Sequence, residues 1–186
     1  MSSKHIFIIG PGGVGKSTSG ALLASVLRIP FIDLDQVFMH RIGPIDSYIQ
    51  EYGYKKYCLA NSELFYSILT ALLEQSVIVL SSGFLAHEEM DNLTTKHRDT
   101  LKEQGVSICL LPSVSIKEST DIIVRRQLAR GFGLEEKRER KKFMERYRIY
   151  NNIGDIQIYS IMSPENIAIE MAAQLSKRSR NFLKKR

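Results

Sequence analysis

Cysteine is scarce in this chain, which has only two among 186 residues. Cys58 and Cys109 lie far apart, with no C-x-x-C spacing and no cluster with histidine. A disulfide framework needs several cysteines, and a zinc site needs Cys or His ligands in closely spaced pairs. The sequence therefore argues against both, and it is compatible with a reducing compartment.

Long hydrophobic runs are also missing. The first apolar run, Ile6–Ile9, ends at Gly10 and is too short for the hydrophobic region of a secretory signal. Nothing elsewhere approaches the roughly 20 apolar residues of a membrane-spanning helix. We expect a soluble, cytoplasmic protein that does not enter a membrane.

Acidic residues are absent from the last ten positions, 177–186, which hold six lysines and arginines, although the whole chain has a formal charge of only +6. Such a segment could contact nucleic acid or an anionic membrane, but chain ends are commonly disordered. Because the length suits one domain, we expect a single domain over 1–176 and a disordered basic tail over 177–186.

A glycine-rich segment is the most informative feature that is present. Residues 10–17 read Gly-Pro-Gly-Gly-Val-Gly-Lys-Ser and match G-x-x-x-x-G-K-[ST], directly after the apolar run Ile6–Ile9. This pattern is typical of a phosphate-binding loop when a strand precedes it and a helix follows. The alternative is a glycine-rich turn that happens to lie before a helix.

The chemistry of such a loop explains its residues. Backbone N–H groups in the glycine-rich turn form an anion nest, and the following helix adds the positive end of its dipole. Lys16 would reach the β- and γ-phosphates, while the Ser17 hydroxyl would bind Mg²⁺. The sequence therefore predicts binding of a nucleoside triphosphate with Mg²⁺.

Short apolar runs alternate with helical patterns along the whole chain. Strands are expected at Ile6–Ile9, Phe31–Ile32, Val77–Leu80, Val106–Leu111 and Ile156–Ile158. Helices are expected at 17–27, 45–52, 54–74, 88–103 and 164–175, with mostly helical structure over the charged segment 115–150. This alternation predicts a three-layer α/β/α domain with a central parallel sheet. The segment 115–140 would form a small helical lid.

Two carboxylates, Asp33 and Asp35, follow the second apolar run. Their spacing would project both from one side of an extended chain. Because ligands of open α/β sheets bind outside the carboxyl ends of the strands, the pair is predicted to lie beside the phosphate loop. One of the two could instead cap a helix that begins here.

Three classes of nucleotide-binding protein compete for this pattern. A GTPase would need an N-K-x-D element, and none occurs in the sequence. A motor would normally end a buried strand in an acidic residue, whereas Val77–Leu80 is followed by serines. A small-molecule kinase needs the loop, two carboxylates and lid arginines, and all of these are available.

Further segments resemble the shikimate kinase family. They are Phe31-Ile-Asp-Leu-Asp35, Gly43-Pro-Ile45, Gly53, Ser82-Gly-Phe84, Arg130 before Gly131, and Arg146-Tyr-Arg-Ile-Tyr150 followed by Gly154-Asp155. The resemblance runs from Ile6 to about Leu175. It implies a monomeric enzyme with the P-loop fold of nucleoside monophosphate kinases, which uses Mg²⁺ and ATP to phosphorylate a hydroxyl of shikimate, a small carboxylated ring.

The resemblance also implies which residues hold the nucleotide. The phosphates would lie on Lys16 and on the backbone of Gly13, Val14, Gly15, Lys16, Ser17 and Thr18. Asp33 would act through the water shell of the Mg²⁺ that Ser17 binds. Arg130 would cover the transferring phosphoryl group, and Arg125 would lie along the adenine, although Arg126 is equally well placed in the sequence.

The same resemblance implies the acceptor site. Asp35 would bind the substrate hydroxyls and act as general base, and Gly83 would let the backbone approach the ring. Arg146 would hold the carboxylate as a bidentate fork. The alternatives are a strand-end glycine for Gly83 and a solvated helix charge for Arg146.

Three positions depart from the family pattern. Cys58 stands where the family has an arginine that helps to hold the carboxylate, a loss of about 1.5–3 kcal/mol or roughly ten- to a hundredfold in affinity. Phe84 replaces a glycine and would place a ring at the edge of the pocket, and the lid reads Arg130-Gly-Phe-Gly rather than R-P-L-L. Lys55 or Lys56 could supply the missing charge.

Two other functions therefore remain open. One is a kinase of the same build that acts on another hydroxylated acid or sugar acid. The other is a noncatalytic nucleotide-binding protein whose tail, Lys177–Arg186, binds nucleic acid.

Overall fold

A five-stranded sheet forms the centre of the computed structural model, which describes residues 5–87, 89–129 and 135–183. The strands are β1 (His5–Ile9), β2 (Phe31–Asp33), β3 (Val77–Val79), β4 (Gly105–Leu111) and β5 (Ile156–Tyr159). Their order is β2-β3-β1-β4-β5, and every neighbouring pair is parallel. The carboxyl ends of all five strands therefore lie at one edge, where a ligand of this type of sheet binds.

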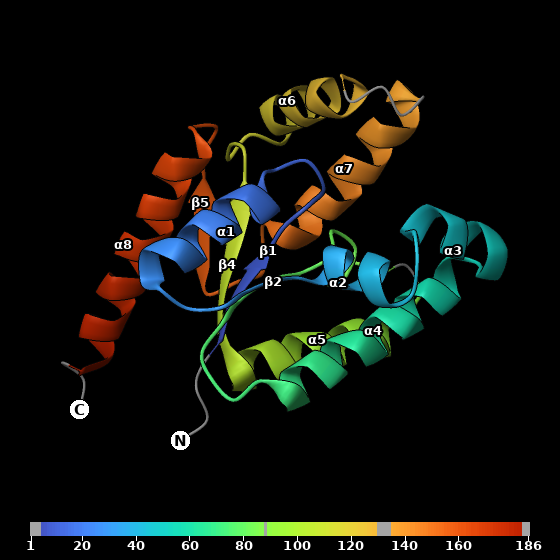
Figure 1. Ribbon diagram of the computed structural model, residues 1–186. Helices are drawn as coiled ribbons and strands as arrows, with labels where there is room; N and C mark the ends of the chain where they lie inside the picture. Colours follow the sequence, from blue (N-terminus) through green and yellow to red (C-terminus); the bar gives the residue numbers. More distant parts are fainter. Residues whose placement is uncertain (1–4, 88, 130–134, 184–186) are drawn as a thin grey trace.

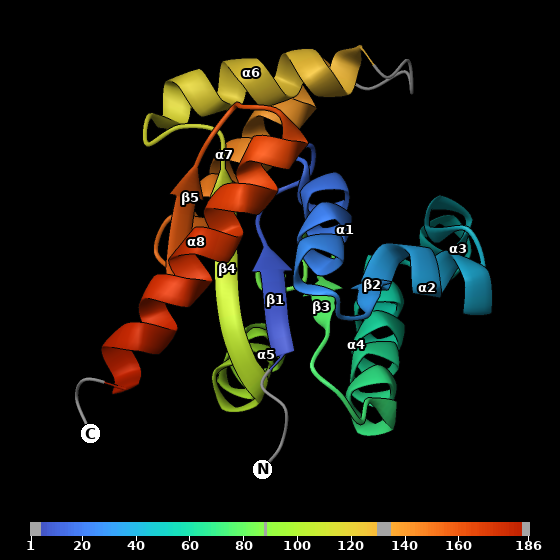
Figure 2. The ribbon, with the colours of Figure 1, turned by 60° about the vertical axis from the view of Figure 1, so that its left-hand side comes forward.

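Helices cover both faces of the sheet, which confirms the predicted three-layer α/β/α architecture. They are α1 (Lys16–Leu27), α2 (Leu34–Arg41), α3 (Ile45–Tyr52), α4 (Tyr54–Ala71), α5 (Asp91–Gln104), α6 (Ile116–Leu128), α7 (Glu136–Tyr150) and α8 (Pro164–Leu183). Helices α1 and α8 lie side by side on one face, while α4 and α5 lie on the other (Figures 1 and 2). Within the described residues, no helix has the length and apolar character needed to span a membrane.

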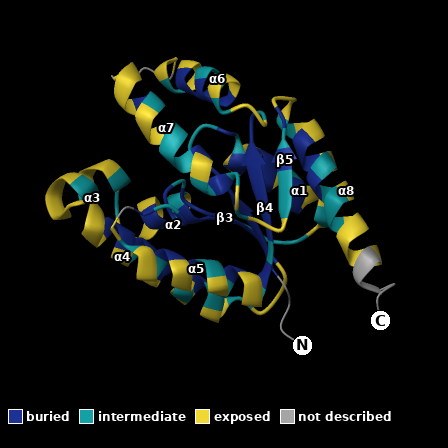
Figure 3. Ribbon diagram, turned by 180° about the vertical axis from the view of Figure 1, so that it is seen from behind, coloured by how far each residue is buried: buried dark blue, intermediate teal, exposed yellow. Residues whose placement is uncertain are grey.

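The central strands are buried along their whole length. Every residue of β1 and of β3 is buried, because parallel strands with helices on both faces have no solvent-exposed side. Figure 3 shows the same contrast, with buried strands in the middle and exposed residues on the outer surfaces of the helices. The core thus gives the carboxyl edge of the sheet a rigid base.

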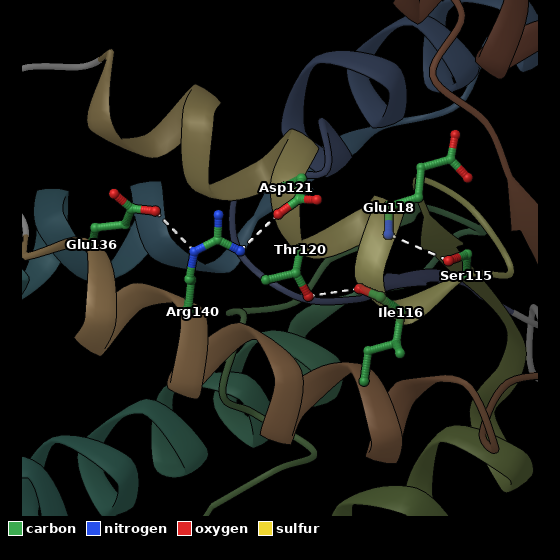
Figure 4. Close-up of polar contacts among 7 residues, drawn as sticks. All are labelled: Ser115, Ile116, Glu118, Thr120, Asp121, Glu136 and Arg140. Carbon is green, nitrogen blue, oxygen red and sulfur yellow. Dashed lines mark hydrogen bonds and ion pairs between the residues drawn. The ribbon is translucent and has the colours of Figure 1, made fainter.

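Helices α6 and α7 form a hairpin beyond this edge (Figures 1 and 2). Arg140 of α7 connects them, since its Nη1 atom lies 2.7 Å from Asp121 of α6 and its Nε atom 2.9 Å from Glu136 (Figure 4). Ser115 caps α6 by accepting a hydrogen bond from the Glu118 N–H (Figure 4). These ion pairs are about 40–60% exposed, so each contributes only about 0–1 kcal/mol. The segment 115–140 as a lid stays a prediction.

The basic tail differs from the expectation. Helix α8 continues to Leu183, so the prediction that the helix ends near Leu175 and that disorder begins at residue 177 is wrong for residues 177–183. Arg178 explains part of this order, because its Nη2 atom lies 2.7 Å from the Asp155 carboxylate. That carboxylate also accepts hydrogen bonds from the backbone and the hydroxyl of Ser107 in β4. Residues 184–186 lie outside the described part of the chain.

Gly20 of α1 offers a test of how tightly the helix lies on the sheet. A Cβ atom here would lie 2.7 Å from Val79 and 3.0 Å from Ile8. We expect Gly20→Ala to lower the free energy of unfolding by about 1–2 kcal/mol, since overpacking outweighs the gain in helix propensity. Chemical denaturation measures this difference. Ser25→Thr, which adds a methyl group at an exposed position of α1, is the control and should change little.

Candidate active site

The glycine-rich segment forms a tight loop between β1 and α1, as the sequence predicts. Gly13 and Gly15 have φ angles of 81° and 95°, a region that residues with side chains rarely adopt. A Cβ atom on Gly13 would also lie 3.2 Å from the Ile123 side chain of α6. The loop can therefore keep its backbone N–H groups available only because these positions carry no side chain.

Lys16 lies inside this loop rather than in solvent. Its side chain is 8% exposed, and its Nζ atom donates hydrogen bonds to the carbonyls of Gly10 (2.9 Å) and Pro11 (3.0 Å). Burial lowers its pKa to about 8, although the negative charges of Asp35 and Asp33 act in the opposite direction. The ammonium group is thus held where incoming phosphates would meet it.

Asp33 is the N-cap of α2. Its Oδ1 atom accepts hydrogen bonds from the backbone N–H groups of Asp35 (3.0 Å) and Gln36 (3.2 Å). The prediction that both carboxylates project from an extended chain end is therefore wrong: β2 ends at Asp33, and Asp35 lies in the first turn of α2. The helix starts early because an aspartate at this position satisfies its free N–H groups. Both carboxylates nevertheless lie close enough to Lys16 to affect its pKa.

Asp35 is positioned by a hydrogen-bond chain from two neighbouring elements. Ser81, after β3, donates its hydroxyl to Asp35 Oδ1 at 2.5 Å, and Asn61 of α4 donates to the Ser81 oxygen at 2.9 Å. Burial raises the pKa of Asp35, while the Ser81 hydrogen bond and the charge of Lys16 partly offset this effect. Sequence reasoning missed Ser81 and Asn61, although the serines after the third strand were a visible signal.

Arg146 comes from α7 and faces the same edge of the sheet. Its Nη1 atom donates to the Ser82 hydroxyl at 2.9 Å, and its charge lowers the pKa of both Lys16 and Asp35. Arg146 also lines a cleft of about 840 Å³ together with Asp46 and Ile49 of α3. The structure therefore brings together Lys16, Asp33, Asp35 and Arg146, which lie far apart in the sequence.

Gly83 lies beneath Arg146, but other side chains cover it. A Cβ atom at this position would lie 3.0 Å from Arg146 Nη2 and 2.7 Å from the hydroxyl of Tyr54. Glycine thus leaves room here for the close approach of these two side chains. Sequence reasoning missed Tyr54, and its place directly after the helix-breaking Gly53 was the only available signal. Approach of a substrate ring to Gly83 stays a prediction.

Phe84 and Cys58 do not line the cleft, contrary to expectation. The Phe84 ring is fully buried and stacks on His97, with 3.9 Å between ring centroids, because an apolar ring is more stable in the core than at a polar edge. Cys58 is also fully buried, and its Sγ atom lies 3.1 Å from His87 Nδ1. Burial raises the pKa of the Cys58 thiol to about 11, so it is uncharged at neutral pH.

The roles of Arg125 and Arg130 toward the nucleotide stay predictions. Arg125 and Arg126 are both exposed on α6, and Arg130 lies outside the described residues. The α6 residues that line the cleft beside the phosphate loop are Ile123, Val124 and Gln127. Gln127, whose amide would lie 3.2 Å from a Cβ on Gly12, is a neighbour of the phosphate loop that sequence reasoning missed.

The donor set fits a magnesium ion better than a preformed metal cage. No group of three or more His, Cys, Asp or Glu side chains in the described part of the chain could hold a metal ion. Mg²⁺ needs only one or two protein oxygens besides nucleotide phosphates and water. Ser17, exposed in the first turn of α1, and Asp33 are oxygen donors of this kind.

Comparison with known proteins identifies the family. The family model described as shikimate kinase matches residues 12–176. The chain belongs to the shikimate kinase family. The shikimate kinase of Mannheimia succiniciproducens is 31% identical over 186 residues, covering 96% of this chain and 97% of the relative. That of Pasteurella multocida is 31% identical over 182 residues, covering 92% and 93%.

Solved structures show that shikimate kinases share this fold. The enzyme from Aquifex aeolicus superposes with a TM-score of 0.73 at 21% identity, covering 94% of this chain and 98% of the other. The Acinetobacter baumannii enzyme in complex with shikimate gives 0.73 at 17% identity, with 95% and 94% covered. A gluconokinase from Sinorhizobium meliloti gives 0.69 at 16% identity, with 98% and 97% covered.

The Ser81 hydrogen bond can be tested by titration. Because this bond favours the ionised form of Asp35, we expect Ser81→Ala to raise the pKa of the Asp35 carboxyl above its value in the unaltered protein. Carboxyl NMR over a pH series measures this change. Ser47→Ala, at an exposed position of α3, is the control. An Asp35 pKa that falls or does not move in the Ser81 variant would contradict the assignment.

Proposed function

We propose that this member of the shikimate kinase family is an ATP-dependent kinase that transfers the γ-phosphoryl group to a hydroxyl of shikimate. One observation carries the proposal. Lys16, Asp33, Asp35 and Arg146 converge at the carboxyl edge of the sheet, where the charges of their neighbours shift the pKa values of Lys16 and Asp35. They provide a cation for the phosphates and a carboxylate for a hydroxyl proton, together with a second cation for an anionic acceptor.

The phosphate end of the reaction belongs to the loop and α1. Backbone N–H groups of residues 13–18 and the Lys16 ammonium hold the ATP phosphates. Ser17 and Asp33 hold Mg²⁺, Asp33 through its water shell, and the ion supplies charge neutralisation on the phosphate oxygens when bound. Arg130 and Arg125 belong to the proposal as the arginines over the phosphoryl group and the adenine.

The acceptor end belongs to Asp35 and Arg146. Asp35 accepts the proton of the attacking hydroxyl at a carboxylate oxygen, and its raised pKa makes it a stronger base than an ordinary aspartate. Ser81 fixes the carboxylate by binding its Oδ1 atom. Arg146 binds the acceptor's carboxylate, and Gly83 lets the backbone approach the ring.

The proposal also includes a cytoplasmic enzyme that acts as a monomer, as the family resemblance implies. Both cysteines are free thiols and buried, which suits a reducing compartment. The one-domain sheet needs no second copy to complete the cluster of Lys16, Asp35 and Arg146. Size-exclusion chromatography with light scattering measures the oligomeric state.

The substrate is tested by ADP release from ATP and Mg²⁺ with added acceptors. We expect shikimate to stimulate release, and Asp35→Asn to lower kcat by about 10²–10⁴-fold, because the amide cannot accept the proton. The affinity for ATP, measured by calorimetry in the same variant, should change far less.

Gluconate and other sugar acids serve as the comparison acceptors, since a gluconokinase shares the fold. Stimulation by one of these acids but not by shikimate would show that this acid, rather than shikimate, is the acceptor. An Asp35 variant of normal rate would show that another group accepts the proton.

Asp33→Asn separates capping from metal binding. Asparagine caps a helix about as well as aspartate, so the melting temperature should hardly change. Loss of the negative charge should raise the Mg²⁺ concentration for half-maximal rate by about 10- to 100-fold. If the Mg²⁺ dependence matched that of the unaltered protein, Asp33 would be a structural cap alone.

A further inference from the structure

The hydroxyl of Tyr54 lies beside Arg146, next to Gly83. Tyr54 begins α4, directly after Gly53 with its φ of 85°. It is 39% exposed, and it lines the 840 Å³ cleft together with Arg146 and Ala86. Its side chain can therefore reach a ligand bound in this cleft.

Tyr54 and Arg146 converge on a single point. The position of a Cβ on Gly83 lies 2.7 Å from the Tyr54 hydroxyl and 3.0 Å from Arg146 Nη2. The two side chains come from different elements, α4 and α7, and meet above a residue that has no side chain of its own. Together they place a neutral and a charged donor side by side.

The Tyr54 hydroxyl is held in place and stays protonated. Its ring packs against Tyr57 and His87, at centroid distances of 5.9 and 6.2 Å. Burial raises its pKa to about 12, and the charge of Arg146 only partly offsets this effect. At neutral pH the phenol therefore keeps its proton. Interactions of the hydroxyl with Cys58 and Arg146 fix its position before a ligand arrives, which lowers the entropic cost of binding.

The other groups below the cleft cannot take this role. Cys58, one turn after Tyr54, is fully buried and its thiol is uncharged. Burial lowers the pKa of His87 to about 4, so this ring is neutral as well. The three atoms nearest to a Cβ on Gly83 all belong to Tyr54 and Arg146.

We propose that Tyr54 is a second binding residue for the acceptor, and that its hydroxyl donates a hydrogen bond to the same carboxylate that Arg146 binds. The inference rests on the proposed function, and it adds how the site selects its acceptor. A clamp with one cation and one neutral donor fits a compact hydroxylated ring with a single carboxylate.

The test compares Tyr54→Phe with Tyr52→Phe. Both changes remove one phenolic hydroxyl, but Tyr52 is an exposed residue of α3. We expect Tyr54→Phe to raise the KM for shikimate by about 10- to 100-fold, the effect of one hydrogen bond to a charged group. The KM for ATP, kcat and the melting temperature should stay near those of the Tyr52 variant.

The methyl ester of shikimate distinguishes a carboxylate contact from a general change in the site. Because the ester has no negative charge, the preference of the unaltered protein for shikimate over the ester should shrink in Tyr54→Phe. Equal losses for both acceptors, or an unchanged KM for shikimate, would overturn the Tyr54 assignment.

Calorimetric binding of shikimate separates this inference from the proposed function. If the unaltered protein binds shikimate and Tyr54→Phe binds it equally well, only the Tyr54 assignment fails. If the unaltered protein neither binds nor phosphorylates shikimate, the proposed function fails, and the role of Tyr54 toward this acceptor fails with it.

Discussion

The buried ammonium group of Lys16 is the constraint on which the rest of the site depends. A cation removed from water needs compensation. Two loop carbonyls bind it directly, while Asp33 at the end of β2 and Asp35 in the first turn of α2 stabilise its charge. The order of the strands makes this possible, because only β3 lies between β1 and β2. Phosphate loop and carboxylates thus form one electrostatic unit with Arg146, rather than a set of independent contacts.

The two halves of the site differ in how they are built. The nucleotide half is built largely from backbone, and its shape depends on glycines whose φ angles other residues rarely adopt. The acceptor half consists of side chains from α2, α4, α7 and the segment after β3, and its geometry depends on how those helices pack. Departures from the family pattern can therefore accumulate around the acceptor half, as at the buried residues Cys58 and Phe84, while the glycine-rich loop still matches its motif.

The sequence was sufficient for the sheet, for the loop and for the nearness of Asp33 and Asp35 to that loop, because apolar runs and glycine spacing are local signals. Only the family resemblance placed Arg146 with them. The sequence was insufficient for residues whose roles arise from packing. Nothing local shows that Phe84 turns into the core to stack on His97, or that the Asp35 carboxylate is bound by Ser81. Residues 34 and 35 could have extended the strand or begun the helix. They begin α2 because the Asp33 side chain caps it. The length of α8 depended on a partner 23 residues away, Asp155.

The ion pair between Arg178 and Asp155 limits how the role of the basic C-terminal segment can be tested. Arg178 ties the last turns of α8 to Asp155, and through it to Ser107 in the sheet. Cutting the chain at residue 177 would leave this carboxylate without its cation, so a truncated protein would confuse loss of charge with loss of structure. Neutralising Lys177 and Arg180 one at a time, while keeping Arg178, would remove surface charge and preserve the ion pair that joins α8 to Asp155.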